Sequence, residues 1–373
     1  MMKVVIAPDS FKGSLSSTEV ARAAAKAVAD CFPSCSTVTV GAADGGEGTV
    51  RAMTAALGGD LIKVMVSDPL GRQVEAEYGK AGDTAVIETA AACGLVLLSP
   101  EERNPMDTST FGVGEMILDA LGRGCGRFII GLGGSATNDG GTGMLSALGV
   151  RFLDSEGREI RGCGGSLGKI VDMDCSGIPE SLSRCSFTVA CDVDTPFCGP
   201  SGAAEVFAPQ KGAGPEQVKI LDMGMAGFAG LVKDKLGRDI AAIPGSGAAG
   251  GLGGAFSAFL GARLRSGVDM VLDAIGFDSL LEGADLVITG EGRADGQTPK
   301  GKTAAGILRR AGRAGIPTVL IAGEVENSEA LESLGFRDII RVTPEGMPLE
   351  VAMDPEVAAG NIYRALVDYF GRR

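Results

Sequence analysis

Residues 4–14, Val4-Val5-Ile6-Ala7-Pro8-Asp9-Ser10-Phe11-Lys12-Gly13-Ser14, join a short apolar run to a polar loop. The run is long enough for one buried strand, and Ser16-x-x-Glu19 then has the spacing of a helix capping box. Apolar residues recur at helical spacing from Val20 to Cys31. A buried strand followed by an amphipathic helix is the repeating unit of a doubly wound α/β fold.

The carboxyl-terminal part of the chain repeats this pattern. Further strands are predicted at residues 38–40, 286–289, 318–321 and 339–342. Helices are predicted at about 47–57, at 303–313, and after Asp354-Pro355, where the aspartate is a suitable N-cap and the proline suits the first turn. Five strands alternating with helices predict a doubly wound parallel sheet of the order 2-1-3-4-5.

The second and third of these strands are separated by far more chain than one crossover needs. Residues 60–281 are therefore expected to form an inserted α/β domain, and residues 1–59 and 282–373 a discontinuous first domain. The insertion has its own candidate strands and two glycine-rich loops, expected at 61–66, 85–88, 128–131, 187–190, 131–143 and 245–254.

The composition excludes several classes of function. The 373 residues include no histidine, so a Ser-His-Asp triad, an imidazole base and a histidine-ligated zinc are all impossible. Proton transfer must use carboxylates, lysines, cysteines or tyrosines. The net charge is −13 and no basic stripe is present, which argues against nucleic-acid binding. Anionic substrates would need local cations or a metal to offset this charge.

The chain is expected to be cytoplasmic and to have no membrane partner. Its apolar amino-terminal run is too short for a secretory signal. The uncharged stretch 243–262 contains seven glycines and Pro244, which favours a glycine-rich loop followed by a short helix over a membrane span. The nine cysteines lack a C-x-x-C pair and are expected to be reduced thiols.

Three polar loops are expected at one rim of the first sheet, because ligands bind at the carboxyl ends of parallel strands. Any one loop could consist of turn and capping residues only, but three together favour a ligand site. Their candidate site residues are Asp9, Ser10, Lys12, Asp44, Gly45, Gly46, Glu47, Glu291, Arg293 and Asp295.

The loop GLGGSATNDGG at 131–141 follows an apolar strand and precedes an apolar run. Its glycines and the following helix start are typical of a phosphate site, with Gly133, Gly134, Ser135, Thr137 and Asn138 as candidates. GLGGSA also satisfies G-x-G-x-x-A, and Asp154 follows about 20 residues on, as in a dinucleotide site. Residues 138–141 argue against that alternative, because a carboxylate and two glycines would occupy the first helical turn.

Asp192 and Asp194 follow the predicted strand 187–190 directly. Carboxylates at a strand end could ligate Mg²⁺ or accept a substrate proton. The alternative is a simple turn before Pro196.

Five segments of the chain resemble signature segments of the bacterial type I glycerate kinases. They are APDSFKGSLSS (7–17), ADGGEGT (43–49), GLGGSATNDGGTGMLSALGVRFLD (131–154), ACDVDTPFCGPSGAAEVFAPQKGA (190–213) and VITGEGRADGQT (287–298). The resemblance implies ATP-dependent phosphorylation of D-glycerate, usually to 2-phosphoglycerate, with Mg²⁺. It also implies a flavodoxin-like domain carrying an inserted α/β domain, with the active site in the cleft between them. One departure is Lys300, which stands where the family commonly has histidine.

Roles follow from the demands of phosphoryl transfer, which needs positioning and charge stabilisation. We expect Lys12 and Lys302 to neutralise the transferring phosphate, while amides of 133–137 and 245–254 bind the nucleotide. We expect carboxylates drawn from Asp44, Glu47, Asp192 and Glu291 to hold Mg²⁺, Asp192 or Asp295 to act as base, and Arg293 to bind the substrate carboxylate. Asp9, Ser10, Asp44, Gly45 and Gly46 are expected at the substrate.

Two rival functions remain open at this point. One is an NAD(P)-dependent dehydrogenase built on GLGGSA and Asp154, and the other is a non-catalytic regulator that binds a small acid. The sequence also leaves open whether the protein is a monomer or a homodimer.

Overall fold

The computed structural model describes residues 1–41, 48–295, 298, 303–326 and 331–371. The chain divides into two compact units, each with its own sheet. Unit 1 consists of Met1–Asp44 and Val268–Arg373, and unit 2 of Gly45–Gly267.

The sheet of unit 1 has five parallel strands in the order β13-β12-β11-β1-β2. Its strands are β1 (Lys3–Ile6), β2 (Ser36–Thr39), β11 (Leu286–Ala294), β12 (Thr318–Val325) and β13 (Asp338–Arg341). Numbered within the unit, this order is 2-1-3-4-5, so the predicted flavodoxin-like sheet is confirmed.

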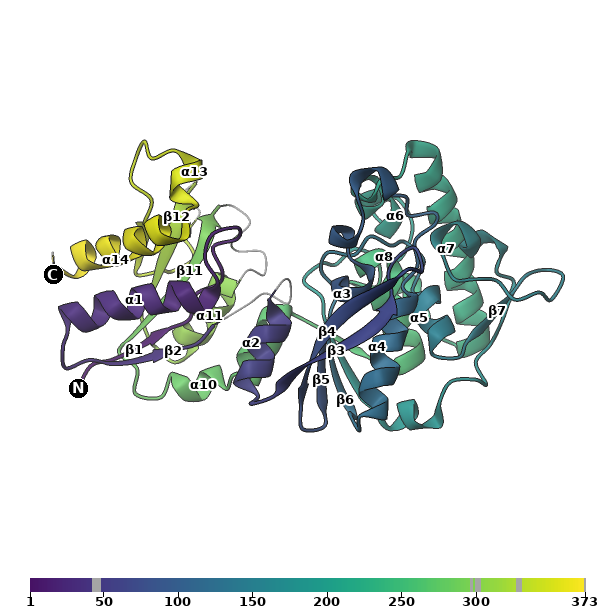
Figure 1. Cartoon of the computed structure of the whole chain (residues 1–373), viewed down its shortest axis with the longest axis horizontal. Coiled ribbons are helices and arrows are strands. Elements are labelled where there is room, and N and C mark those ends of the chain that lie inside the picture. The colour runs from purple at the N-terminus through teal and green to yellow at the C-terminus, as the bar shows by residue number, and fades with distance from the viewer. Residues whose placement is uncertain (42–47, 296–297, 299–302, 327–330, 372–373) are drawn as a thin grey trace. The chain divides into compact units, whose positions relative to one another are not determined.

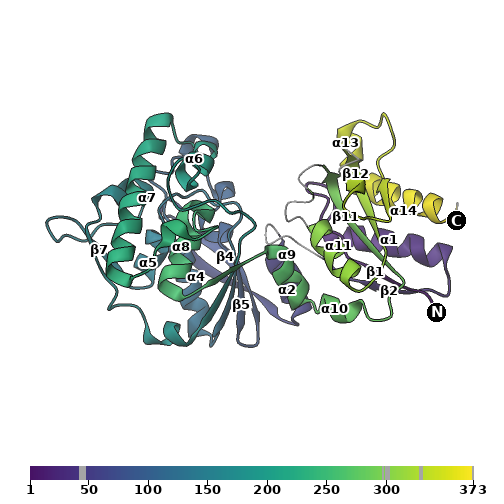
Figure 2. The same cartoon turned by 180° about the vertical axis from the view of Figure 1, so that it is seen from behind.

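Helices cover both faces of this sheet, as doubly wound topology requires. The helices are α1 (Ser17–Cys31), α9 (Gly267–Ala274), α10 (Phe277–Leu280), α11 (Thr303–Arg313), α13 (Leu349–Ala352) and α14 (Pro355–Gly371). Figure 1 shows α1 and α14 on one face, where Val20 and Ile362 pack with Ile6. Figure 2 shows α11 on the opposite face, where Ile307 packs with Val5.

The predicted helix starts are confirmed. Ser16 and Glu19 form a reciprocal capping box, with the Glu19 amide 3.3 Å from Ser16 Oγ and the Ser16 amide 2.8 Å from Glu19 Oε2. Asp354 Oδ1 accepts hydrogen bonds from the amides of Glu356 and Val357 at 3.0 and 3.1 Å. These side chains satisfy amides that a helix leaves unpaired in its first turn.

Strand β11 is longer than the sequence predicted. Residues 290–294 were expected to be a loop, but their ladder with β12 continues to the pair Ala294–Val325. A β-carbon on Gly290 would lie 2.6 Å from the Ile321 side chain, so glycine here permits close approach of the two strands. Glu291 and Arg293 therefore lie on a strand.

Unit 2 contains a six-stranded mixed sheet in the order β10-β9-β6-β5-β4-β3 and a separate pair, β7-β8. The strands are β3 (Asp60–Ser67), β4 (Gln73–Ala81), β5 (Thr84–Glu88), β6 (Arg127–Gly131), β7 (Arg151–Leu153), β8 (Asp172–Asp174), β9 (Ser186–Ala190) and β10 (Arg263–Arg265). The four predicted strands of this sheet are confirmed, whereas β4 and β10 were missed.

Seven α-helices of unit 2 lie in its described part. They are α2 (Thr49–Ala56), α3 (Ala90–Cys93), α4 (Phe111–Gly122), α5 (Thr142–Ala147), α6 (Ala203–Phe207), α7 (Pro215–Leu236) and α8 (Ala248–Leu260). As expected, α8 lies within the uncharged stretch 243–262. Ala249, Gly250 and Gly251 have left-handed backbone angles, which kink its first turn.

The chain passes from unit 1 to unit 2 after residue 44 and returns to unit 1 after residue 267. Both boundaries come earlier in the sequence than the expected ones, after residues 59 and 281. Helix α2 belongs to unit 2 because the Val50 amide donates to Glu88 Oε1 at 2.9 Å and Thr54 packs against Gly79. The chain of unit 1 resumes at Val268, which joins its core together with Phe277. These packing contacts cannot be read from periodicity alone.

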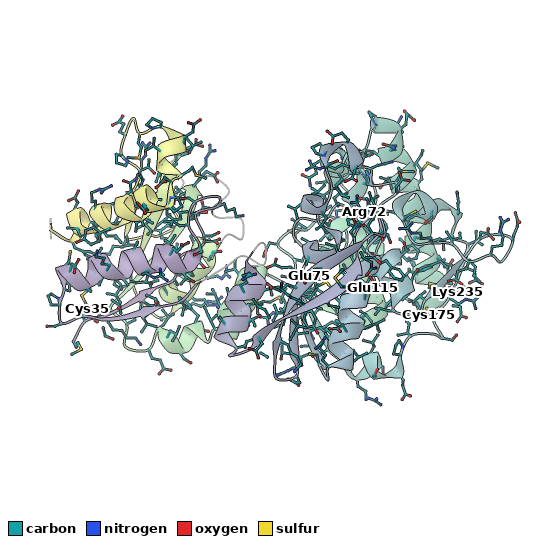
Figure 3. The ribbon with its side chains drawn as sticks, in the orientation of Figure 1. Cys35, Arg72, Glu75, Glu115, Cys175 and Lys235 are labelled. Atoms are coloured by element: carbon teal, nitrogen blue, oxygen red, sulfur yellow. The ribbon has the colours of Figure 1, made fainter. Side chains whose placement is uncertain are left out.

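All nine cysteines are free thiols, as predicted. They occur in both units; Cys35 belongs to unit 1 and Cys175 to unit 2 (Figure 3). Within the described part of the chain, no helix combines the length and apolar character needed to cross a membrane.

Candidate active site

A pocket of about 550 Å³ lies at the carboxyl ends of the parallel strands of unit 1. Its walls come from residues 9–12 after β1, 291–293 of β11, 341–343 at the end of β13, and the segment around α13. This is the edge at which open parallel sheets bind ligands. The pocket gathers the predicted site residues Asp9, Ser10, Lys12, Glu291 and Arg293.

Asp9 connects three elements of this edge. Its amide donates to the carbonyl of Gly290 at 2.8 Å, which fixes the loop after β1 against β11. Its Oδ1 accepts from the Ser10 amide at 2.7 Å, and its Oδ2 accepts from Thr303 Oγ1 at 2.7 Å. The carboxylate thus has a defined orientation at the start of α11.

Thr298 joins two further acidic residues. Its hydroxyl donates to Glu291 Oε1 at 2.8 Å and accepts from the Asp295 amide at 3.1 Å. Glu291 is only 6% exposed, so it depends on such partners. Asp295 is half-buried at the end of β11, outside the pocket lining.

Arg293 lines the pocket, and its Nη2 donates to Glu326 Oε1 at 2.6 Å. Its Nε lies 3.9 Å from Asp295 Oδ2. The guanidinium is therefore engaged by protein carboxylates, which weakens its predicted role as the substrate clamp.

The glycine-rich loop after β6 exposes only its tip. Gly133 and Gly134 form an exposed turn, whereas Ser135 is 6% exposed and Thr137 and Asn138 are fully buried. The part of this predicted phosphate loop that faces solvent is therefore the turn at Gly133 and Gly134, with Ser135 at its edge.

Lys211 lies buried beneath this loop, and the sequence analysis missed it. Its Nζ donates to the carbonyl of Thr137 at 2.6 Å and to Ser135 Oγ at 3.0 Å. Burial lowers the pKa of Lys211 to about 8, although the nearby Cys93 and Asp139 oppose that shift. These bonds tie the inner side of the loop to a charged group.

Asp139 fixes the far end of the loop. Its buried carboxylate accepts from the Thr110 amide and hydroxyl, both at 2.8 Å, and from the amides of Gly141 and Gly143 at 3.0 and 3.1 Å. Burial raises the pKa of Asp139, and these hydrogen bonds act in the opposite direction. The predicted carboxylate in the first helical turn is therefore a structural anchor.

The second glycine-rich segment, 245–254, does not offer a phosphate cradle. It is buried almost throughout, and several of its amides are already bonded; that of Gly247 donates to Thr195 O and that of Gly254 to Ser246 O. The Gly140 amide donates to Gly250 O at 2.9 Å, so the two glycine-rich segments pack against each other. The burial and the existing hydrogen bonds of 245–254 do not support its expected role in binding nucleotide phosphates, and that role stays a prediction.

Asp192 lies in unit 2, just after β9, and is exposed. Its two carboxylate oxygens accept from the Gly267 amide at 3.0 and 3.2 Å. Asp192 thus anchors the residue that precedes the return of the chain to unit 1.

The dinucleotide alternative fails on strand topology. A dinucleotide fold places the next strand beside β6, but the neighbours of β6 are β5 and β9, and β7 pairs with β8 in a separate sheet. Asp154 is engaged locally, by the Arg158 side chain at 2.9 Å and by the amides of Glu156 and Arg158. The dehydrogenase reading is therefore not supported.

Comparison with known proteins agrees with the segments quoted from the sequence. The model of the Glycerate kinase family matches residues 4–368. The chain belongs to this family.

Several proteins named glycerate kinase are similar to this chain over nearly their whole length. Glycerate kinase of Bacillus subtilis (strain 168) is 46% identical over 356 residues, covering 95% of this chain and 93% of the relative. Glycerate 2-kinase of Escherichia coli (strain K12) is 47% identical over 326 residues, covering 87% of this chain and 86% of the relative. A crystal structure described as glycerate kinase 2 from Salmonella typhimurium LT2 has a TM-score of 0.90 and 43% identity, covering 100% of this chain and 98% of that one. A non-catalytic regulator finds no support in these relatives.

Several predicted residues of this glycerate kinase family member lie outside the described part of the chain. They are Asp44, Gly45, Gly46, Glu47 and Lys302, and Lys300 also lies there. Their predicted roles stay predictions.

The predicted magnesium ligands do not form a complete cluster among the residues that the structure describes. No group of three Cys, Asp or Glu side chains there is arranged so that it could hold a metal ion, and Asp192 and Glu291 belong to different units. Asp9 and Glu291 do offer carboxylate oxygens at one pocket. That donor set suits Mg²⁺, which is commonly held by one or two carboxylates together with water and phosphate.

Sequence reasoning also missed Arg341, which lines the pocket. It was assigned only to the strand run 339–342. The available signal was its position, since a charged residue at the carboxyl end of a predicted parallel strand faces the ligand edge. Lys211 gave no comparable signal, because a lysine is rarely expected to be buried.

Proposed function

We propose that this protein transfers the γ-phosphoryl group of ATP to the 2-hydroxyl of D-glycerate. Full-length similarity to proteins named glycerate kinase carries this proposal. The Escherichia coli relative, named glycerate 2-kinase, supports the choice of hydroxyl.

The acceptor is proposed to bind in the pocket of unit 1. Lys12 and Arg341 supply positive charge to that pocket in a chain whose net charge is −13. Local cations of this kind are what an acidic protein needs in order to attract an anionic substrate. Asp9 and Ser10 supply oriented oxygens for the acceptor hydroxyls.

The nucleotide phosphates are proposed to bind at the exposed turn Gly133–Gly134 and at Ser135. Glycine allows backbone amides to approach phosphate oxygens closely. Lys12 and Lys302 are proposed to neutralise the transferring group. Location of the reaction in a cleft between the two units stays a prediction.

Direct transfer needs a group that takes the proton of the attacking hydroxyl, and Asp295 or Asp192 is proposed for that role. Bound Mg²⁺ would supply charge neutralisation at the phosphates. Glu291 and Glu47, with Asp192, are the proposed carboxylates for it.

The experiment is a coupled assay of ADP formation by purified protein with ATP, Mg²⁺ and D-glycerate, with D-glycerate omitted as the control. We expect glycerate-dependent ADP, and a ³¹P NMR spectrum of the product is expected to match 2-phosphoglycerate. Absence of glycerate-dependent ADP would refute the kinase proposal. A spectrum of 3-phosphoglycerate would refute only the choice of hydroxyl.

A further inference from the structure

Two arginines line the pocket of unit 1, and they differ in their ion pairs. Arg293 donates to Glu326 at 2.6 Å. Arg341 is exposed and has neither an ion pair nor a side-chain hydrogen bond to any residue in the described part of the chain. The charge of Arg341 is therefore not offset by a neighbouring carboxylate of this structure, whereas that of Arg293 is.

The backbone of Arg341 is fixed at the edge of the pocket. Arg341 is the last residue of β13 and pairs with Ala322 of β12. The next amide, that of Val342, donates to Ala322 O at 2.8 Å, so the ladder extends past Arg341. A ligand that binds Arg341 would need to order only the arginine side chain, because the main chain is already held.

The wall of the pocket is partly apolar. Met347 and Met353 line it, and so does Asn361, which is 2% exposed. The Asn361 amide is itself engaged, since its Oδ1 accepts from Arg364 at 2.8 Å and its Nδ2 donates to Met347 Sδ at 3.4 Å. Apolar walls lower the local dielectric constant, which strengthens an ion pair formed with Arg341.

We propose that Arg341 binds the carboxylate of the acceptor and makes the pocket selective for small hydroxy carboxylates over uncharged polyols. A guanidinium offers parallel N–H groups that match a carboxylate in a bidentate pair. The inference rests on the proposed kinase function and moves the carboxylate-binding role from Arg293 to Arg341.

The competing occupant is the nucleotide. A pocket of about 550 Å³ is larger than a three-carbon acid requires, and phosphate oxygens also pair with arginine. The two occupants predict different kinetic effects. An acceptor site predicts a raised KM for D-glycerate, and a nucleotide site predicts a raised KM for ATP.

The test compares Arg341→Gln with the control Arg337→Gln. Arg337 is an exposed arginine just before β13, and its Nε lies 3.9 Å from Asp338 Oδ2. We expect Arg341→Gln to raise the KM for D-glycerate about 30-fold or more, as loss of a charge-assisted pair does. The KM for ATP should change less than about threefold. Phosphorylation of glycerol, which lacks the carboxylate, should be the same in Arg341→Gln and wild type. Arg337→Gln should match wild type throughout.

Calorimetric titration with D-glycerate alone separates this inference from the kinase proposal, because binding needs no phosphoryl transfer. We expect binding to the wild type and to Arg337→Gln, and about 30-fold weaker binding to Arg341→Gln. An unchanged affinity for D-glycerate in Arg341→Gln, a rise in the KM for ATP instead, or no binding to the wild type would each overturn the inference. Binding without turnover would refute only the kinase proposal.

Discussion

Gly250 lies against the backbone of the predicted phosphate loop, and a β-carbon there would sit 2.1 Å from the carbonyl oxygen of Thr137. Its φ of +68° is also unfavourable for any L-residue. We expect Gly250→Ala to lower the free energy of unfolding by about 2–4 kcal/mol, the sum of overpacking and left-handed backbone strain. Denaturant unfolding measures this change.

Gly261 provides the matched control at the end of the same helix. Its φ is +63°, but a β-carbon there would meet nothing within 4 Å. Gly261→Ala should cost only about 1 kcal/mol, from backbone strain alone. Equal losses in the two variants would contradict the packing role assigned to Gly250.

Asp295 and Asp192 are the two candidates for the base that takes the proton of the attacking hydroxyl. Replacing the base by asparagine removes its proton affinity but keeps an acceptor oxygen. We therefore expect either Asp295→Asn or Asp192→Asn to lower kcat by about 10²-fold or more with little change in stability. Steady-state kinetics and thermal unfolding of both variants distinguish the two. The variant that is not the base should retain near-normal kcat, and near-normal kcat in both would reject the base assignment.

Helix α11 is joined to α9 and α10 by the nearly buried side chain of Arg310. Its guanidinium lies 3.2 Å from Asp269, 2.7 Å from Asp273 and 3.2 Å from Asp278. Arg310→Met should lower the free energy of unfolding by roughly 1–3 kcal/mol, because three partly exposed carboxylates lose the cation that they share. The exposed Arg313, in the last turn of α11, is the control, and Arg313→Met should change stability by less than about 0.5 kcal/mol.

The same cluster predicts a pH dependence. Burial raises the pKa of Asp269, but hydrogen bonds from Arg309 and Arg310 outweigh burial and hold that pKa below its ordinary value. A depressed carboxylate pKa contributes stability above the unfolded-state value and loses it as pH falls through the folded-state value. The stability difference between wild type and Arg310→Met should therefore shrink below about pH 4. A constant difference from pH 7 to pH 3 would contradict the ion-pair account.

Local sequence signals were enough to predict the strands and the strand order of the sheet of unit 1. The capping box at Ser16 and the apolar runs of β1, β12 and β13 act within one element, so periodicity reveals them. The extension of β11 and the assignment of α2 to unit 2 depend on partners distant in sequence, and these were not predicted.

In the candidate site, too, some residues could be predicted from local sequence and others depend on partners distant in sequence. Loops at strand ends predicted Asp9 and Lys12 correctly as pocket residues, because topology alone places them there. The depth of a side chain is not a local property. The burial of Thr137 and the position of Lys211 beneath it arise from packing between segments about 70 residues apart.

Over the whole molecule, separate hydrophobic cores underlie the two units. Ile6 and Val5 belong to cores built only from unit 1, and Phe128 belongs to one built only from unit 2. Chains with more than one core commonly depart from two-state unfolding. We therefore expect calorimetry to resolve two transitions, with Arg310→Met lowering one of them and Gly250→Ala lowering the other.

A ligand identifies the transition of unit 1 independently of these variants. If D-glycerate binds the pocket of unit 1, at 100 times its Kd it should stabilise that unit by about 2.7 kcal/mol and raise its transition by about 5 °C or more. The transition lowered by Gly250→Ala should move little, and Arg341→Gln should remove most of the shift at the same concentration. D-glycerate stabilises the 150-residue unit 1, and Arg310→Met destabilises the same unit. The unfolding transition that the ligand raises must therefore be the one that Arg310→Met lowers. A shift confined to the transition that Gly250→Ala lowers would place the acceptor in unit 2 and contradict the pocket assignment.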